Sequence, residues 1–300
     1  MARPRPVAMI VAVMLALGLV VAALMIPRLA ADNLLRGDDD GDGHAHGDAG
    51  GGAAPKMEHI HGIGIDPHDG AVYAGTHYGL FRVADGDVTR VGDRVQDYMG
   101  FTVAGPGQFL ASGHPGEGQG GPSSVGLIES TDAGQTWETL SLSGAADFHA
   151  LEYRHDRVYG LNSMTGQLLV SGDKRSWEEL TRAEIADFAV SPEDPDVLVA
   201  TTEDGLTRST DAAATFEVVE SAPVLIFVSW AEDGTLAGVT PDGVVHTASG
   251  PGGEWTERAA LPGRPEALTI DSATNVYAAA DGTVLVSTDG GDTFSSMLDQ

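Results

Sequence analysis

A short motif recurs five times in this chain at an almost constant interval. The copies begin at Ser130, Ser171, Ser209, Ser249 and Ser287, which are 41, 38, 40 and 38 residues apart. The fullest copy reads "STDAGQTW", and the others match or decay from the pattern S-x-D-x-G-x-x-W. A fixed period of about forty residues is typical of proteins built from one repeated supersecondary unit. The period constrains the fold more than any other feature of the chain.

The motif has the composition of a tight hairpin turn, in which Ser and Asp oxygens accept hydrogen bonds from turn amides and Gly adopts a positive φ. Two apolar runs separated by a turn precede each copy, and one further pair, at residues 62–83, has no recognisable motif after it. Six units of about four short strands predict an all-β, six-bladed β-propeller over residues 57–300, because each blade buries its faces against its neighbours. A two-sheet sandwich would not produce the fixed period.

The motif resembles the Asp box, or BNR repeat, of sialidase-like propellers, and the resemblance covers residues 57–300. Bacterial proteins with these repeats are described as sialidase-like glycosyl hydrolases. The resemblance implies that each box joins the outer two strands of a blade, far from the active site. Similar repeats build the non-enzymatic sortilin ectodomains and a photosystem assembly factor. The resemblance therefore predicts the fold and leaves the activity open.

An apolar segment precedes the repeats. Residues 7–26 carry no charge, and twenty helical residues reach about 30 Å, the thickness of a bilayer's hydrocarbon core. We predict an uncleaved single-pass anchor with residues 1–6 in the cytoplasm. A cleaved secretory signal is the alternative, although its apolar core usually has about 7 to 15 residues. Arginines flank the segment on both sides, so charge does not fix its orientation. The acidic, all-β body favours a propeller on the extracytoplasmic side of the cell membrane.

Residues 27–56 are rich in Gly and Asp and have almost no apolar periodicity, so we predict a flexible linker. The aspartates from Asp38 to Asp42 match the opening of a calcium loop. Ala49, however, stands where that loop needs a bidentate glutamate. The linker histidines His44 and His46 could bind a transition metal loosely.

Charge and cysteine content exclude several functions. The formal net charge is −28, and Lys56 and Lys174 are the only lysines. Such a chain would repel phosphate backbones, so we do not expect nucleic acid as a partner. The absence of cysteine excludes disulfides, thiolate metal sites and cysteine nucleophiles. The partners expected are the membrane, through the N-terminal helix, and a small ligand, a glycan or an extracytoplasmic protein.

Histidines gather at matched positions of the first three repeats. Aligning the innermost strands places one residue of each blade at the mouth of the central channel: His61, Met99, His149, Ala186, Val224 and Glu266. The ends of the second strands add His77 and His114 on the same face, and His59 precedes His61 by two residues. Because blade six closes beside blade one, we predict a ligand site formed by His59, His61, His77, Met99, His114, His149 and Glu266.

The residue types indicate a metal. Neutral imidazoles bind copper, zinc, iron and nickel, and a thioether favours copper. We therefore predict a transition-metal site, with copper slightly ahead of zinc, at His61, His77, Met99, His114 and His149. The alternative is that each histidine is an ordinary strand or turn residue.

A sialidase-like glycoside hydrolase with a non-standard active site is the alternative function. By the resemblance, such an enzyme holds its substrate carboxylate with three arginines and uses a tyrosine and carboxyl groups in catalysis. Only Arg94 and Arg264 lie in loops leading to innermost strands, so the arginine triad is not found. Asp97, Tyr98 and Asp147 are weak catalytic candidates near the mouth.

Overall fold

The computed structural model describes residues 57–116 and 118–298. These residues form six four-stranded antiparallel sheets, each built from four strands that are consecutive in the chain. The innermost strands are β1 (Ile60–Ile65), β5 (Asp97–Gly105), β9 (Phe148–Arg154), β13 (Ile185–Val190), β17 (Phe227–Trp230) and β21 (Pro265–Ile270). The second strands are β2 (Val72–Thr76), β6 (Gln108–His114), β10 (Arg157–Asn162), β14 (Leu198–Thr202), β18 (Leu236–Val239) and β22 (Val276–Ala280).

The outer strands complete the blades. The third strands are β3 (Gly79–Ala84), β7 (Leu127–Ser130), β11 (Gln167–Ser171), β15 (Gly205–Ser209), β19 (Val244–Ala248) and β23 (Thr283–Ser287). The outermost strands are β4 (Asp87–Val91), β8 (Glu138–Ser141), β12 (Glu178–Arg182), β16 (Glu217–Val218), β20 (Thr256–Ala260) and β24 (Ser295–Ser296). The second strand of blade one is buried at every residue, whereas β8 and β16 are largely exposed. Burial is therefore greatest in the middle strands of a blade and lowest in its outermost strand.

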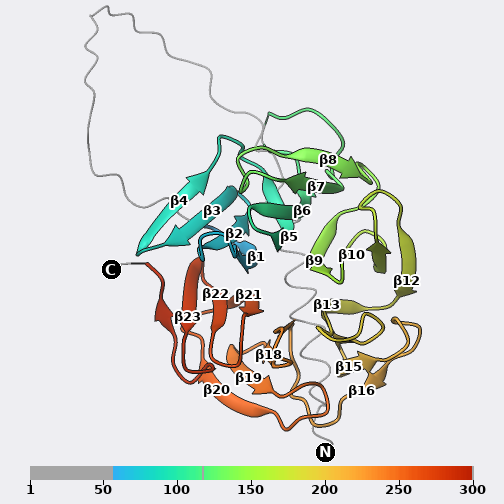
Figure 1. Cartoon of the computed structure of the whole chain (residues 1–300), viewed down its shortest axis with the longest axis vertical. Coiled ribbons are helices and arrows are strands. Elements are labelled where there is room, and N and C mark those ends of the chain that lie inside the picture. The colour runs from blue at the N-terminus through green and yellow to red at the C-terminus, as the bar shows by residue number, and fades with distance from the viewer. Residues whose placement is uncertain (1–56, 117, 299–300) are drawn as a thin grey trace, which may run out of the picture. The chain divides into compact units, whose positions relative to one another are not determined.

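The sheets are arranged as blades around a central axis, and β21 returns beside β1 (Figure 1). The described part of the chain contains no helix, so the predicted all-β, six-bladed β-propeller is confirmed there. A parallel bridge between Gly86 and Leu298 joins the C-terminal tail to blade one. Clusters of buried side chains lie between neighbouring blades, as in the cluster that joins Phe81 of blade one to Ala279 of blade six. Circular closure thus brings residues from the two ends of the described chain together.

The repeated Ser/Asp motif forms the turn between the third and fourth strands of a blade. In blade two, the Ser130 hydroxyl accepts a hydrogen bond from Gly134 N at 2.8 Å, and Asp132 accepts one from Thr136 N at 2.8 Å. Gly134 has a φ of 85°, and the Trp137 indole donates to the Gly134 carbonyl at 3.0 Å. These contacts confirm the predicted turn chemistry, and the turn is far from the innermost strands.

We expect Asp132→Ala to lower the free energy of unfolding by about 1–2 kcal/mol, because the change removes charge-assisted hydrogen bonds to Thr136. Asp211→Ala should also lower it, since Asp211 makes the same contacts with Thr215. Asp204→Ala, in the turn between β14 and β15, is the exposed control. Denaturant unfolding measures all three. Equal midpoints for the motif variants and the control would show that the Asp contacts do not stabilise the turn.

Side chains of one blade bind the innermost strand of the next. The inner edge of these strands has no strand partner, so its N–H groups need other acceptors. Four such pairs run around the ring: Val190 N to Glu152, Val228 N to Asp187, Ile270 N to Ser229 and Ile60 N to Glu266. The last pair joins blade six to blade one. Polar side chains near the channel therefore hold the blades in register.

The predicted anchor over residues 7–26 and the predicted linker over residues 27–56 lie outside the described residues. Within residues 57–116 and 118–298, no helix has the length and apolar character needed to cross a membrane. The anchor and the orientation of the chain stay predictions.

Candidate functional site

The position that sequence alignment placed at the channel mouth is a β-bulge in five of the six blades. The register between the first and second strands shifts by one residue there, so the extra residue has no partner on the second strand. The five extra residues are His61, Met99, His149, Ala186 and Glu266. A bulge redirects its side chain relative to a regular strand. The alignment therefore found a real structural equivalence, and blades one and three use it to present histidine.

Four of the predicted histidines meet on one face of the ring, where the first strands begin and the second strands end. The Nε2 atoms of His61 and His77 are 3.4 Å apart. His77 lies in the turn after β2, and its Nδ1 donates to Asp97 Oδ1 at 2.7 Å. His114, at the end of β6, donates through Nδ1 to Asp97 Oδ2 at 2.9 Å. Asp97 thus bridges blade one to blade two.

A second carboxylate continues the chain of contacts into blade three. Asp147 Oδ2 lies 3.4 Å from His114 Nε2 and accepts a hydrogen bond from His149 Nε2 at 3.0 Å. The Ser163 hydroxyl donates to the same oxygen at 3.2 Å. Imidazoles and carboxylates therefore alternate from His77 to His149 across three blades, and His61 lies next to His77. We call the six residues the His/Asp chain: His61, His77, Asp97, His114, Asp147 and His149.

Backbone geometry allows these groups to approach. Gly113 has a φ of 142°, and a Cβ there would come within 2.1 Å of the Asp97 carbonyl oxygen. Only glycine permits this approach of β6 to β5, which sets His114 beside Asp97. His59 has a left-handed φ of 55°, which is uncommon for a residue with a side chain. Its ring centroid lies 5.0 Å from that of His77, so His59 and His61 flank His77.

The pKa values of the titratable groups are shifted in different directions along the His/Asp chain. Burial, with a contribution from His77, lowers the pKa of His61 to about 3, so this imidazole is neutral at physiological pH. Hydrogen bonds to Asp147 and Asp97 raise the pKa of His114 to about 10, so it is an imidazolium between two carboxylates. Burial alone would raise the pKa of Asp97, but hydrogen bonds from His114 and His77 outweigh it and hold this pKa at about 2. The His/Asp chain therefore has a neutral imidazole that can bind a metal in blade one, and charged groups in blades two and three.

His61, His77 and Asp97 form a group whose donor atoms could hold a metal ion. Two imidazole nitrogens about 2.0–2.1 Å from one tetrahedral zinc ion would lie about 3.3–3.4 Å apart, close to the 3.4 Å observed. His77 also donates its other ring nitrogen to a carboxylate, which is the usual arrangement around a metal-binding histidine. The predicted preference for copper rested on the thioether of Met99. Met99 is half-buried at the bulge of β5, and its part in the site stays a prediction.

Two of the predicted residues, Glu266 and Tyr98, make structural contacts. The Glu266 carboxylate accepts hydrogen bonds from Gly282 N at 2.8 Å and Ile60 N at 3.5 Å, so it closes the ring between blades six and one. Tyr98 is 1% exposed and packs in the core against Trp137. Its side chain leaves β5 on the side opposite to Asp97, because neighbouring strand residues alternate.

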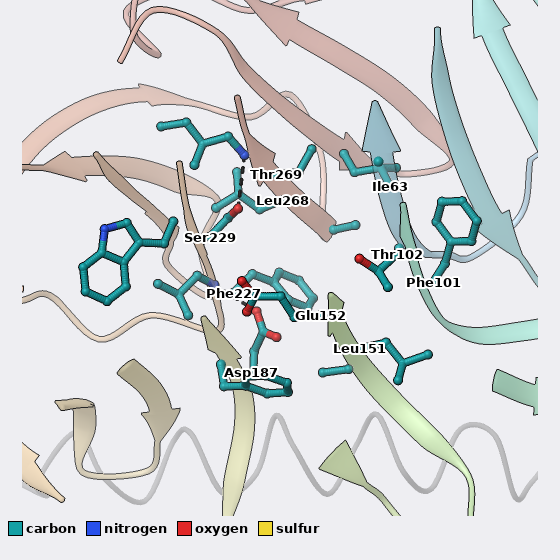
Figure 2. Close-up of a pocket in the computed structure, with 18 of the residues that line it drawn as sticks. Ile63, Phe101, Thr102, Leu151, Glu152, Asp187, Phe227, Ser229, Leu268 and Thr269 are labelled. Carbon is teal, nitrogen blue, oxygen red and sulfur yellow. Dashed lines mark hydrogen bonds between the residues drawn. The ribbon is translucent and has the colours of Figure 1, made fainter. Parts of the chain in front are cut away.

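The six innermost strands enclose a cavity of about 360 Å3, with His61 and His149 among its lining residues. Figure 2 shows the carboxyl groups of Glu152 and Asp187 next to each other in this channel. Sequence reasoning missed both acids and did not foresee that Asp97 and Asp147 bridge histidines. Both acids could have been found from the sequence, because each is a charged residue within the largely apolar pattern of an innermost strand.

Comparisons with known proteins support the fold. No protein-family model matches the chain, and no curated protein matches it. Among solved structures, a gluconolactonase, XC5397 from Xanthomonas campestris, is 13% identical with a TM-score of 0.62, over 77% of this chain and 86% of that one. A nidogen/laminin complex is 10% identical with a TM-score of 0.59, over 76% and 93% of the two chains. YCF48 bound to a D1 peptide is 18% identical with a TM-score of 0.49, over 81% and 83%.

These structural similarities support the class of fold, and they do not identify an activity. The described part of the protein is a six-bladed β-propeller that carries the His/Asp chain at one mouth of its channel. At identities of 10% and 13%, the nidogen/laminin and gluconolactonase structures share the fold alone. The Asp-box family and the sialidase resemblance stay predictions.

Proposed function

We propose that this protein binds one divalent transition-metal ion, zinc or copper(II), at the mouth of its channel. The ligands are His61 and His77 through Nε2, with Asp97 orienting His77 and His59 as a third imidazole beside it. The observation that carries the proposal is the 3.4 Å separation of the two Nε2 atoms, together with the carboxylate on Nδ1 of His77. His61 is neutral at physiological pH, so no proton competes strongly for it.

A metal titration tests this proposal. The full chain carries His44→Ala and His46→Ala, so that the linker histidines do not contribute. We expect one zinc or copper(II) ion per chain and at least a tenfold loss of affinity (~1.4 kcal/mol) in His61→Ala. His246→Ala is the matched control, because His246 lies on β19 of blade five. No bound metal, or an equal loss in His246→Ala, would refute the proposal.

The carboxylate beside His77 should also contribute to metal affinity. We expect Asp97→Asn to lower metal affinity by about 10- to 100-fold, because the amide can no longer accept charge-assisted hydrogen bonds from both His77 and His114. The same titration measures it. Asp66→Asn, in a buried turn on the opposite face, should leave the affinity unchanged. An affinity in Asp97→Asn equal to that of the parent chain would remove Asp97 from the site.

We further propose that the propeller is held on the extracytoplasmic side of the cell membrane by residues 7–26. The uncharged segment and the acidic linker after it support this placement. A protease added outside intact cells should release the propeller by cutting residues 27–56. If the propeller were protected until the cells are lysed, it would lie on the cytoplasmic side, which would contradict the proposal.

The geometry gives less support to a glycoside hydrolase. Such an enzyme needs a carboxylic acid whose pKa is raised so that it can protonate the leaving group. Hydrogen bonds from histidines instead hold the pKa of Asp97 and that of Asp147 below the usual value, against the effect of burial, so neither of these two candidates is such an acid. With Tyr98 in the core as well, the residues expected from the resemblance are not arranged for that reaction.

A further inference from the structure

His114 is the histidine that joins the two carboxylates of the His/Asp chain. Its Nδ1 donates to Asp97 Oδ2 at 2.9 Å, and its Nε2 lies 3.4 Å from Asp147 Oδ2. It stands at the end of β6, where it pairs with Asp97 in the register of β5 and β6. An imidazole that is held at both ring nitrogens cannot turn without losing one contact or both. His114 therefore fixes Asp97 relative to Asp147, although it is not one of the proposed metal ligands.

Asp97 depends on His114 for its orientation. One of its carboxylate oxygens accepts from His77 at 2.7 Å, and the other accepts from His114 at 2.9 Å. The terminal torsion of an aspartate is broad, so a carboxylate that is held by one oxygen can rotate and weaken that contact. With both oxygens engaged, the carboxylate stays aligned with His77 Nδ1. The direction of His77 Nε2, the proposed ligand atom, follows from this alignment.

Asp147 anchors the other side of His114 to blade three. The Ser163 hydroxyl donates to Asp147 Oδ2 at 3.2 Å, and Asp147 N donates to Asn162 Oδ1 at 3.2 Å. Among the described residues, the second carboxylate oxygen, Oδ1, is buried without a hydrogen-bond partner. An unpaired buried oxygen costs folding free energy, so the stability of the fold does not by itself explain this acid. Its contacts with His114 and His149 indicate a role in the site.

We propose that His114 is a positioning residue of the metal site, and that Asp147 holds it in place from blade three. Contacts run from Asp147 to His114, from His114 to Asp97 and from Asp97 to His77. Zinc affinity in blade one then depends on a residue of blade three, as outer-shell partners of metal ligands commonly affect affinity. The inference rests on the proposed function, because it concerns the same metal. The alternative is that His114 only braces blade two against blade three.

Two uncharged variants of His114 separate its two contacts. In His114→Asn the amide nitrogen lies near the position of Nδ1 and can still donate to Asp97, whereas in His114→Gln it lies near that of Nε2 and faces Asp147. Competition with a chelator measures zinc affinity, on the chain that carries His44→Ala and His46→Ala. Loss of a group that contacts a ligand costs about 10- to 100-fold, so for one contact further out we expect His114→Gln to bind zinc about fivefold more weakly than His114→Asn. Equal affinities of the two variants overturn the proposal.

Double-mutant cycles show whether the effect passes along these contacts. In the Asp97→Asn background, His114→Asn and His114→Gln should bind zinc equally within about twofold, because the carboxylate that His114 orients is gone. A difference of the same size in both backgrounds would mean a general disturbance of blade two and overturn the proposal. Asp147→Ala should lower zinc affinity about threefold in the parent chain and leave it unchanged in His114→Asn, which has already lost that contact. Equal losses in both overturn the assignment of Asp147. His246→Gln, on β19, is the control and should have no effect.

The ring of His77 gives a readout that needs no metal. In the metal-free parent chain, the nitrogen NMR shifts of His77 should show the tautomer that is protonated at Nδ1, because Asp97 accepts that proton. His114→Asn should keep this tautomer, and His114→Gln should show a mixture of both. The same tautomer in all three proteins overturns this inference alone. A parent chain that shows the expected tautomer but binds no zinc overturns the proposed function, and with it the metal-site role of His114.

Discussion

Replacing His77 by alanine is expected to lower zinc affinity at least ~100-fold, which is the largest effect of any single change at the metal site. The His77 ring contacts the rings of both His59 and His61, with centroid separations of 5.0 and 4.5 Å. The substitution removes one ligand and also disconnects Asp97 from the metal. Competition with a chromogenic chelator, on the chain without the two linker histidines, measures the affinity.

The neighbouring Tyr78→Ala is the control for His77→Ala. Tyr78 is 51% exposed in the same turn, so its loss tests whether disturbance of the turn alone reduces binding. We expect no more than about a twofold change there, and a loss of about tenfold in His59→Ala, because His59 contacts His77 from the exposed side. A larger loss in His59→Ala than in His77→Ala would place the metal nearer to the start of β1 and contradict the ligand set.

Asp187→Asn is expected to stabilise the propeller more strongly as pH rises from 4 to 8. The pKa of Asp187 is raised from 3.8 to about 7 by burial, so between these values the folded state holds a proton that the unfolded state has lost. Folding stability from this group therefore falls as pH rises through that window. At about 1.4 kcal/mol per pKa unit, the loss reaches about 4 kcal/mol near pH 8. The asparagine variant avoids this loss and keeps the hydrogen bond to Val228.

The comparison must be a difference between two proteins, because other groups titrate in the same range. The pKa of His61 is lowered to about 3, so its contribution to stability rises between pH 3 and 6.5, opposite in sign to that of Asp187. The pKa of His114 is raised to about 10, so its contribution falls above pH 6.5. Denaturant unfolding of the parent chain and Asp187→Asn at each pH, with a chelator present, isolates Asp187. A stability difference that does not change between pH 4 and 8 would contradict the predicted ionisation.

The sequence predicted the position of the site better than its chemistry. Alignment of the innermost strands placed His61 and His149 at equivalent positions, and the structure shows that each is the extra residue of a bulge. The partners of these histidines were not predictable, because a nitrogen-to-oxygen contact depends on side-chain direction to within a few tenths of an ångström. Asp97 and Asp147 were identified only as weak acids near the mouth, whereas they bridge the histidines of adjacent blades.

The sequence alone determined the number of blades and the turns that join their outer strands. Both follow from local rules, because a turn is specified by its own Ser, Asp and Gly residues, and a fixed period requires equivalent units. Only the tertiary structure decided which groups meet. Closing the ring joins Glu266 to Ile60 across 206 residues, and the approach of Gly113 to Asp97 sets His114 in place. The raised pKa of Asp187 has the same origin, since it depends on how the closed ring encloses this side chain.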